Sequence, residues 1–297
     1  MSTSSDDPLP KLKLAPAESA EELAVKFNRE KRAVQQQRES LLTEAPTRFK
    51  IGSVPYLNAI PLTRGREDDL RIAPPSRLAR MLDANEVDAA LISIVEVLLK
   101  DRYDVLNGIG VASLGEVKSV FLAHQRPLEE LETVFCDTAS LTSVCLLKVL
   151  LAERGLTPVY KPFDPGDSAV IPEAVLLIGD PAIQFLLEQR THQIWDLGAA
   201  WYEWTRLPFV YAVWALKRGV ENTALKRQLI EAKDFGLETL EQIIESRTEF
   251  DATFRQDYLG WHIHYHIGAD EQRGIAKFME LLAKHGLGPV FQPRWVS

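Results

Sequence analysis

From residue 49 onward, short apolar segments alternate with longer segments that have one apolar face. The segments 87–92 and 174–178 have the length of buried strands, and each is followed by a segment with helical spacing of its apolar residues. Parallel strands are joined by helical crossovers, which are almost always right-handed. The pattern therefore predicts an α/β protein whose sheets are mostly parallel.

The predicted elements fall into two consecutive groups, and the chain then returns to the first. The first group ends with a strand over 117–123. The second contains strands over 133–136, 174–178 and 194–197 and helices over 143–154 and 181–189. An apolar strand over 209–216 leads back, and helices follow over 223–246, 251–265 and 270–285.

A chain that leaves one α/β lobe, builds a second and returns resembles the type II periplasmic-binding-protein fold. We expect each lobe to be a mixed, mostly parallel sheet flanked by helices. Lobe 1 is predicted to comprise residues 47–123 plus 212–297, and lobe 2 residues 124–211. The ligand site of such a fold lies in the cleft between the lobes, near strand ends and helix N-termini.

Residues 1–46 have a different composition. Three prolines interrupt the start, and the segment 21–42 is charged and rich in glutamine without a strong apolar stripe. We expect a mobile leader with a possible solvent-facing helix.

The net charge of −8 limits the classes of partner. No basic stripe is available to neutralise phosphates, so nucleic acid is not an expected partner. No apolar run is long enough to span a membrane, and the start lacks the layout of a secretory signal. The two cysteines, Cys136 and Cys145, are expected to be reduced and buried, which favours the cytoplasm. An anionic ligand would have to be held by local dipoles.

Three junctions between a strand and a helix carry candidate chemistry. The first, residues 49–62, contains Ser53, Pro55, Tyr56 and Asn58. The second contains Ser140, Thr142 and Ser143, and the third ends in Asp180. Free backbone N–H groups at helix starts, together with hydroxyl groups, suit the binding of a carboxylate.

Several short segments resemble the MqnA family, the chorismate dehydratases of the futalosine route to menaquinone. They extend over nearly all of the chain after about residue 48, in the family's order. The segments are Ser53-Val-Pro-Tyr-Leu-Asn-Ala-Ile-Pro-Leu62, Pro75-Ser-Arg-Leu-Ala-Arg-Met-Leu82, Val87-Asp-Ala-Ala-Leu-Ile-Ser93, Val117-Lys-Ser-Val120, Asp137-Thr-Ala-Ser-Leu-Thr-Ser143, Leu177-Ile-Gly-Asp180 and Leu207-Pro-Phe-Val-Tyr-Ala-Val-Trp214.

The resemblance implies a carbon–oxygen lyase that removes water from chorismate to form 3-(1-carboxyvinyloxy)benzoate, with Asn58 and Ser119 in contact with the substrate. These motifs contain no convincing histidine or glutamate base. We therefore hypothesise that the enolpyruvyl carboxylate of the substrate takes the ring proton while Asn58 and Ser119 hold it. Ser140, Thr142 and Ser143 would bind a carboxylate. Asp137 or Asp180 acting as the base is the competing hypothesis.

Other interpretations of these residues remain open. Asn58 and the hydroxyl residues could simply cap helices, and Asp180 could cap the helix after it. Arg206 occupies a position where the family usually has glycine, which leaves the loop conformation there in question. Three alternating histidines in 262–266 suggest a metal site only on a strand. Because a helix is predicted there, we expect none.

Two other functions fit the same cleft. One is a non-catalytic binding protein for an anionic metabolite, and the other is the related 1,4-dihydroxy-6-naphthoate synthase, whose opening motif differs. The glycine spacings match neither a dinucleotide-binding loop nor a phosphate-binding loop, so no cofactor is predicted. The predicted partner is a small anionic molecule, chorismate.

Overall fold

The computed structural model describes residues 49–166, 170–188, 191–219 and 223–297, together with residues 25, 28, 29, 32, 33 and 36. The chain divides into two units, Met1–Ala45 and Pro46–Ser297. The six described residues of the first unit are helical. The rest of the predicted leader, 1–46, lies outside the described residues.

The second unit contains two mixed sheets, as the sequence predicts for this α/β fold. The first sheet has the order β11-β4-β10-β3-β1-β2, and the second has the order β7-β6-β8-β5-β9. The first comprises β1 (Ile51–Ser53), β2 (Leu70–Ile72), β3 (Ala89–Ser93), β4 (Tyr103–Ser113), β10 (Phe209–Lys217) and β11 (Arg294–Val296). The second comprises β5 (Val120–His124), β6 (Thr133–Asp137), β7 (Val159–Phe163), β8 (Ala174–Ile178) and β9 (Gln193–Asp196).

The strands that lead into helices are parallel to one another within each sheet. In the first sheet β1 pairs in parallel with β2 and β3, and in the second β6 pairs in parallel with β7 and β8. The crossing strands run the other way: β10 is antiparallel to β3 and β4, and β5 is antiparallel to β8 and β9. The proposed lobe boundary at residue 123 falls inside β5, and the one at 211 falls inside β10.

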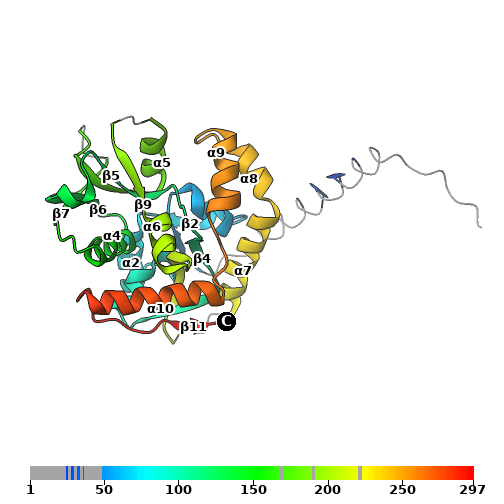
Figure 1. Cartoon of the computed structure of the whole chain (residues 1–297). Helices are drawn as coiled ribbons and strands as arrows, with labels where there is room; N and C mark the ends of the chain where they lie inside the picture. The colour runs from blue at the N-terminus through cyan, green and yellow to red at the C-terminus, as the bar shows by residue number, and fades with distance from the viewer. Residues whose placement is uncertain are drawn as a thin grey trace, which may run out of the picture. The chain divides into compact units, whose positions relative to one another are not determined.

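Helices flank both sheets (Figure 1). They are α2 (Pro75–Asp83), α3 (Ile94–Leu99), α4 (Leu141–Glu153), α5 (Gly179–Glu188), α6 (Leu197–Thr205), α7 (Thr223–Glu238), α8 (Leu240–Ser246), α9 (Ala252–Asp257) and α10 (Ala269–Lys284), with short 3₁₀ helices η1 (Leu57–Leu62), η2 (Glu67–Asp69) and η3 (Leu128–Glu130). Among the residues described, no helix has the length and apolar character needed to span a membrane.

Two of the predicted C-terminal helices are interrupted. The helix expected over 223–246 breaks at Thr239, whose buried hydroxyl donates to the Phe235 carbonyl at 2.7 Å. The helix expected over 251–265 ends early: α9 passes into a π-helical turn, η4 (Tyr258–His262), and the chain is extended at Ile263. His264 then forms a β-bridge with Ala112 of β4. A π turn cannot be read from apolar spacing of this kind.

The element η1 is fixed by close packing of α7. Gly236 of α7 lies directly against the backbone of Pro61, and a Cβ atom added at Gly236 would overlap the Pro61 carbonyl. The core around this contact is apolar, with Leu57 and Leu62 of η1 and Leu229 of α7 almost fully buried. This close approach holds one side of η1, while the first residue of η1, Leu57, donates its N–H to Asp180 of α5.

The chain passes between the sheets after β4 and again before β10. At the second passage Arg206 ends α6 in the left-handed conformation, with φ 58° and ψ 24°. Its backbone N–H donates to the Tyr202 carbonyl at 2.9 Å, and its guanidinium lies 5.6 Å from the centre of the Tyr202 ring. The backbone therefore has the shape that glycine would favour, although arginine occupies the position.

We expect Arg206→Gly to raise the free energy of unfolding by about 1 kcal/mol, because a side chain resists the left-handed region. Arg206→Ala is the matched control, since it removes the contact with Tyr202 but keeps a Cβ atom. Urea unfolding of the three proteins measures the difference. Arg206→Gly being no more stable than Arg206→Ala would contradict the assignment of strain to this position.

Candidate functional site

A cavity lies between the two sheets and is lined by strands of both. Leu91, Val111 and Ala212 come from the first sheet, and Val120 and Ile178 from the second. The remaining lining residues are Val54, Tyr56, Asn58, Pro75, Ser93, Val117, Ser119, Ser140, Ser143, Gly179 and Tyr211. No lining residue in the described part of the chain has a charged side chain.

The polar wall of the cavity consists largely of helix starts. Pro75 and Gly179 are the first residues of α2 and α5, while Ser93 and Ser140 immediately precede α3 and α4. Tyr56 precedes η1 in the same way. The backbone N–H groups of a first helical turn have no partner within the helix and carry a partial positive charge. Some of these N–H groups already donate to side chains, those of Leu57, Val95 and Ser143 among them. The partial positive charge of the helix starts still makes the cavity a favourable environment for an anion, although the lining side chains are neutral.

Asn58 and Ser119, predicted as substrate contacts, both line this cavity and are joined by a third residue. The Asn58 side-chain amide donates to the Tyr258 hydroxyl at 3.1 Å, and this hydroxyl donates to Ser119 Oγ at 2.8 Å. Tyr258 is fully buried. Burial raises the pKa of its phenol well above the usual range, so the ring stays neutral. Asn58 does not cap η1, because it lies within η1 and the capping position is occupied by Tyr56, which makes no side-chain cap hydrogen bond.

The predicted hydroxyl cluster divides between two roles. Ser140 Oγ accepts from the backbone N–H of Ser143 at 3.4 Å and from its hydroxyl at 3.2 Å, and it lies 3.4 Å from Ser93 Oγ. These three serines line the cavity. Thr142 Oγ1 instead accepts from the backbone N–H of Val95 at 3.2 Å, in the first turn of α3. Thr142 is fully buried and is not among the lining residues.

The third junction holds the ring of Tyr56 in place. Gly179 has a φ of +64°, and a Cβ atom built there would come within 2.7 Å of the Tyr56 ring. Asp180 accepts from the backbone N–H of Leu57 at 3.0 Å and therefore binds η1 rather than the cavity. Burial raises the pKa of the Asp180 carboxyl to about 6, and the Glu249 charge acts in the same direction while the Leu57 N–H opposes both.

Two other predicted residues, and the competing base, also lie outside the lining. Ser53 is buried in β1 with no hydrogen-bond partner for its hydroxyl in the described structure, and Pro55 is exposed. Asp137 is buried and accepts from the Ala139 N–H at 2.8 Å. Burial raises the pKa of the Asp137 carboxyl to about 6, against the effect of that hydrogen bond.

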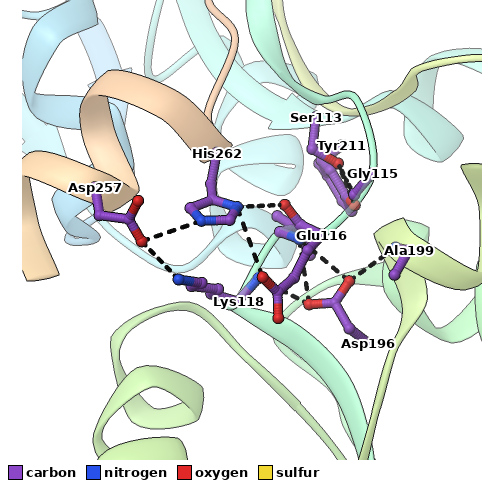
Figure 2. A network of polar contacts seen from close by, with 10 residues as sticks. Ser113, Gly115, Glu116, Lys118, Asp196, Ala199, Tyr211, Asp257 and His262 are labelled. Carbon is purple, nitrogen blue, oxygen red and sulfur yellow. Dashed lines mark hydrogen bonds and ion pairs between the residues drawn. The ribbon is translucent and has the colours of Figure 1, made fainter.

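The loop that carries Ser119 is held from two sides (Figure 2). On one side Asp196 accepts from the N–H groups of Val117 and Lys118, the latter at 2.8 Å, and also caps α6. On the other side Lys118 Nζ lies 2.6 Å from Asp257. His262 completes this side, with Nε2 3.1 Å from Asp257 and Nδ1 2.8 Å from the Glu116 carbonyl. The loop is thus fixed although Lys118 itself has a φ of +61°.

The structure brings together five of the nine predicted site residues in one cavity: Tyr56, Asn58, Ser119, Ser140 and Ser143. It adds Ser93 and Tyr211 to the lining, and Tyr258 behind Asn58 and Ser119. Ser93 and Tyr211 lie in segments already quoted for the family resemblance and could have been found as strand ends. The sequence did not point to Tyr258, because it lies outside the family segments, in a stretch predicted only to be an amphipathic helix.

The histidine-rich segment 262–266 forms neither the regular strand nor the regular helix considered in the sequence analysis. His262 belongs to the π turn and His264 to a β-bridge. Within the described part of the chain, no group of three or more histidine, cysteine, aspartate or glutamate side chains is placed to hold a metal ion.

Solved structures with the same arrangement of sheets define the class of protein. AF1704 from Archaeoglobus fulgidus superposes with a TM-score of 0.65 at 20% identity, covering 80% of this chain and 98% of that one. The periplasmic aliphatic sulphonate binding protein SsuA from Escherichia coli superposes with a TM-score of 0.54 at 17% identity, covering 84% and 93%. The fold is therefore that of the periplasmic-binding-protein-like proteins, and the cavity lies between its two sheets.

Sequence comparison identifies the family. The family described as menaquinone biosynthesis matches residues 49–284. The chorismate dehydratase of Thermus thermophilus is 34% identical over 271 residues, which cover 82% of this chain and 98% of that protein. The chorismate dehydratase of Campylobacter jejuni is 27% identical over 233 residues, covering 76% and 89%. The chain belongs to the menaquinone biosynthesis family, and the resemblance drawn from its motifs is confirmed.

Gly179→Ala tests whether the contact with Tyr56 requires glycine. The new Cβ atom would overlap the ring, so we expect this variant to lose about 1–3 kcal/mol more free energy of unfolding than a control without the overlap. Gly155→Ala is that control, because Gly155 has a φ of +74° and no atom within 4 Å of an added Cβ. Equal losses in urea unfolding would show that only the backbone conformation matters.

Proposed function

We propose that this protein is a chorismate dehydratase that acts in menaquinone biosynthesis. The two relatives described above carry that name, and the family matches the chain over the whole region that builds the cavity. This evidence favours the dehydratase over the two alternatives, the non-catalytic binding protein and the naphthoate synthase. The likeness to a sulphonate-binding protein, at 17% identity, supports the fold alone.

The proposed mechanism rests on the chemistry of the residues that line the cavity. Helix starts and neutral donors surround the space, and among the described residues no carboxylate, histidine or lysine side chain lines it. Removal of the C3 proton still requires a base. The enolpyruvyl carboxylate of the substrate can supply it, because the cavity holds the two reacting parts of one molecule together.

In this proposal Asn58 and Ser119 bind the enolpyruvyl carboxylate and direct it at the C3 hydrogen. The enolpyruvyl carboxylate takes the C3 proton, and the C–H electron pair is delocalised over the ring towards the ring carboxylate. This pair then forms the new C3–C4 double bond as the C4–O bond breaks. The protonated enolpyruvyl carboxyl passes its proton to the departing hydroxide, so that one water molecule is released, the carboxylate is regenerated and the ring becomes aromatic. Ser140 and Ser143, with the first turn of α4, bind the ring carboxylate, where negative charge accumulates during the reaction. The Thr142 hydroxyl accepts from the Val95 N–H of α3 and so holds the start of α4, where these serines lie, in place.

We propose the cytoplasm as the site of action. Cys136 and Cys145 are free and buried in the structure, which suits a reducing compartment. The substrate is the expected small anionic molecule.

Removal of either positioned donor is expected to lower turnover. We expect Asn58→Ala and Ser119→Ala each to reduce kcat by about 10²–10³-fold, the typical loss for one donor aimed at developing charge. The rise of an aromatic ultraviolet spectrum from chorismate measures the rate. Thr63→Ala is the control, since its buried hydroxyl bonds only the η1 backbone, to the Ala59 and Ile60 carbonyls, outside the cavity lining. Wild-type turnover in both variants would exclude these two roles.

The pH dependence separates a substrate base from a protein base. A catalytic Asp137 or Asp180, each with a pKa raised to about 6, must be deprotonated, so kcat would fall tenfold per pH unit below that value. A substrate carboxylate with an ordinary pKa of about 4 keeps kcat level to lower pH. We expect the level profile, and we expect it to persist in Asp137→Asn and Asp180→Asn. If kcat of the wild type fell below about pH 6, and one of the two substitutions removed this fall, the substituted aspartate would be the base.

A further inference from the structure

We propose that Tyr258 is a positioning residue that sets the direction of the hydrogen bonds of Asn58 and Ser119. This inference rests on the proposed function, in which those two residues hold the reacting carboxylate. Tyr258 is not among the residues that line the cavity. It lies one layer behind them, with its ring fully buried and its hydroxyl between both side chains.

The direction of the hydrogen bonds follows from the number of protons available. An amide nitrogen can only donate, so the Tyr258 oxygen accepts from Asn58 Nδ2 at 3.1 Å. The single phenol proton is then donated to Ser119 Oγ at 2.8 Å. Because Ser119 accepts this bond, its own proton is free to point into the cavity. Ser119 is thereby prepared to donate to a carboxylate oxygen, and its hydrogen bond is strengthened by the one it accepts.

The surroundings of Tyr258 keep this arrangement rigid. The ring stacks on Phe254, with ring centres 5.6 Å apart and planes 20° from parallel. Tyr258 begins the π turn, where Ile263 donates its N–H to the Tyr258 carbonyl at 3.1 Å. The neighbouring residues form a second link. Lys118 pairs with Asp257 (Figure 2), and the next residue, Ser119, accepts from Tyr258. Two consecutive residues of the loop are thus bound to two consecutive residues of the helix.

The first test compares Tyr258→Phe with Tyr265→Phe. Both hydroxyls are buried, and the Tyr265 hydroxyl has no hydrogen-bond partner in the described structure. We expect Tyr258→Phe to lower kcat on chorismate about tenfold or more, with a smaller change in KM, and Tyr265→Phe to retain wild-type kcat. Wild-type kcat in Tyr258→Phe would overturn the inference. A loss shared equally by both variants would overturn it too, because it would reflect packing.

A double-mutant comparison tests whether Tyr258 acts through its two partners. We expect Tyr258→Phe to lower kcat clearly less when it is added to Ser119→Ala, or to Asn58→Ala, than when it is added to the wild type. Equal fold-losses in all three backgrounds would show that Tyr258 acts independently of Asn58 and Ser119, against the inference.

A crystal structure of Tyr258→Phe tests the positioning without turnover. We expect the Ser119 hydroxyl or the Asn58 amide to change rotamer or to recruit a water molecule in place of the phenol oxygen. Unchanged side chains without such a water would overturn the inference. If wild-type protein does not convert chorismate, the proposed function fails, while this structural comparison still decides the role of Tyr258.

Discussion

An anion that moves from water into a closed cavity loses its hydration, and the protein has to replace it with donors that are already in place. Charged side chains are the obvious replacement, but a lysine or arginine beside the substrate would also bind its carboxylate tightly and weaken it as a base. The cavity described above uses helix starts and hydroxyl groups instead. Neutral donors also favour the charged form of a carboxylate, but less than a full cation does. A neutral wall is therefore consistent with a substrate that provides its own base.

The fold supplies these helix starts through its strand order. Parallel strands of one sheet present their carboxyl ends, and therefore the helices that follow, along one edge. Both sheets do this: β1 and β3 lead to η1 and α3, while β6 and β8 lead to α4 and α5. The chain enters the second sheet at β5 and returns to the first at β10, and both strands are antiparallel to neighbours in their own sheet. A protein with a net charge of −8 can in this way create a local positive potential without placing a cation there.

Much of this arrangement could be predicted from the sequence, because apolar spacing reports strands directly. The strand expected over 174–178 is β8, and the polar residues after the strands converge as the βαβ order requires. Local pattern does not show which partner a side chain will find. Thr142 looks the same as Ser140 and Ser143 along the chain, yet its hydroxyl bonds α3, and Tyr258 reaches Ser119 across 139 residues. Arg206 illustrates a third limit, since its left-handed backbone is imposed by the end of α6 and not by its own preference.

The hydrogen bonds around the cavity also bear on how a ligand enters. Several of them join elements that follow strands of different sheets: Asp180 to Leu57, Thr142 to Val95, and the Ala139 carbonyl to the Ser76 N–H at 3.3 Å. Each bond contributes only about 1 kcal/mol net, because water can replace either partner when the bond opens. Together they hold the sheets against one another, while a few such bonds are too weak to prevent opening. A ligand that contacts the helix starts of both sheets would add its own contacts to these bonds and so favour the arrangement in which the sheets lie together.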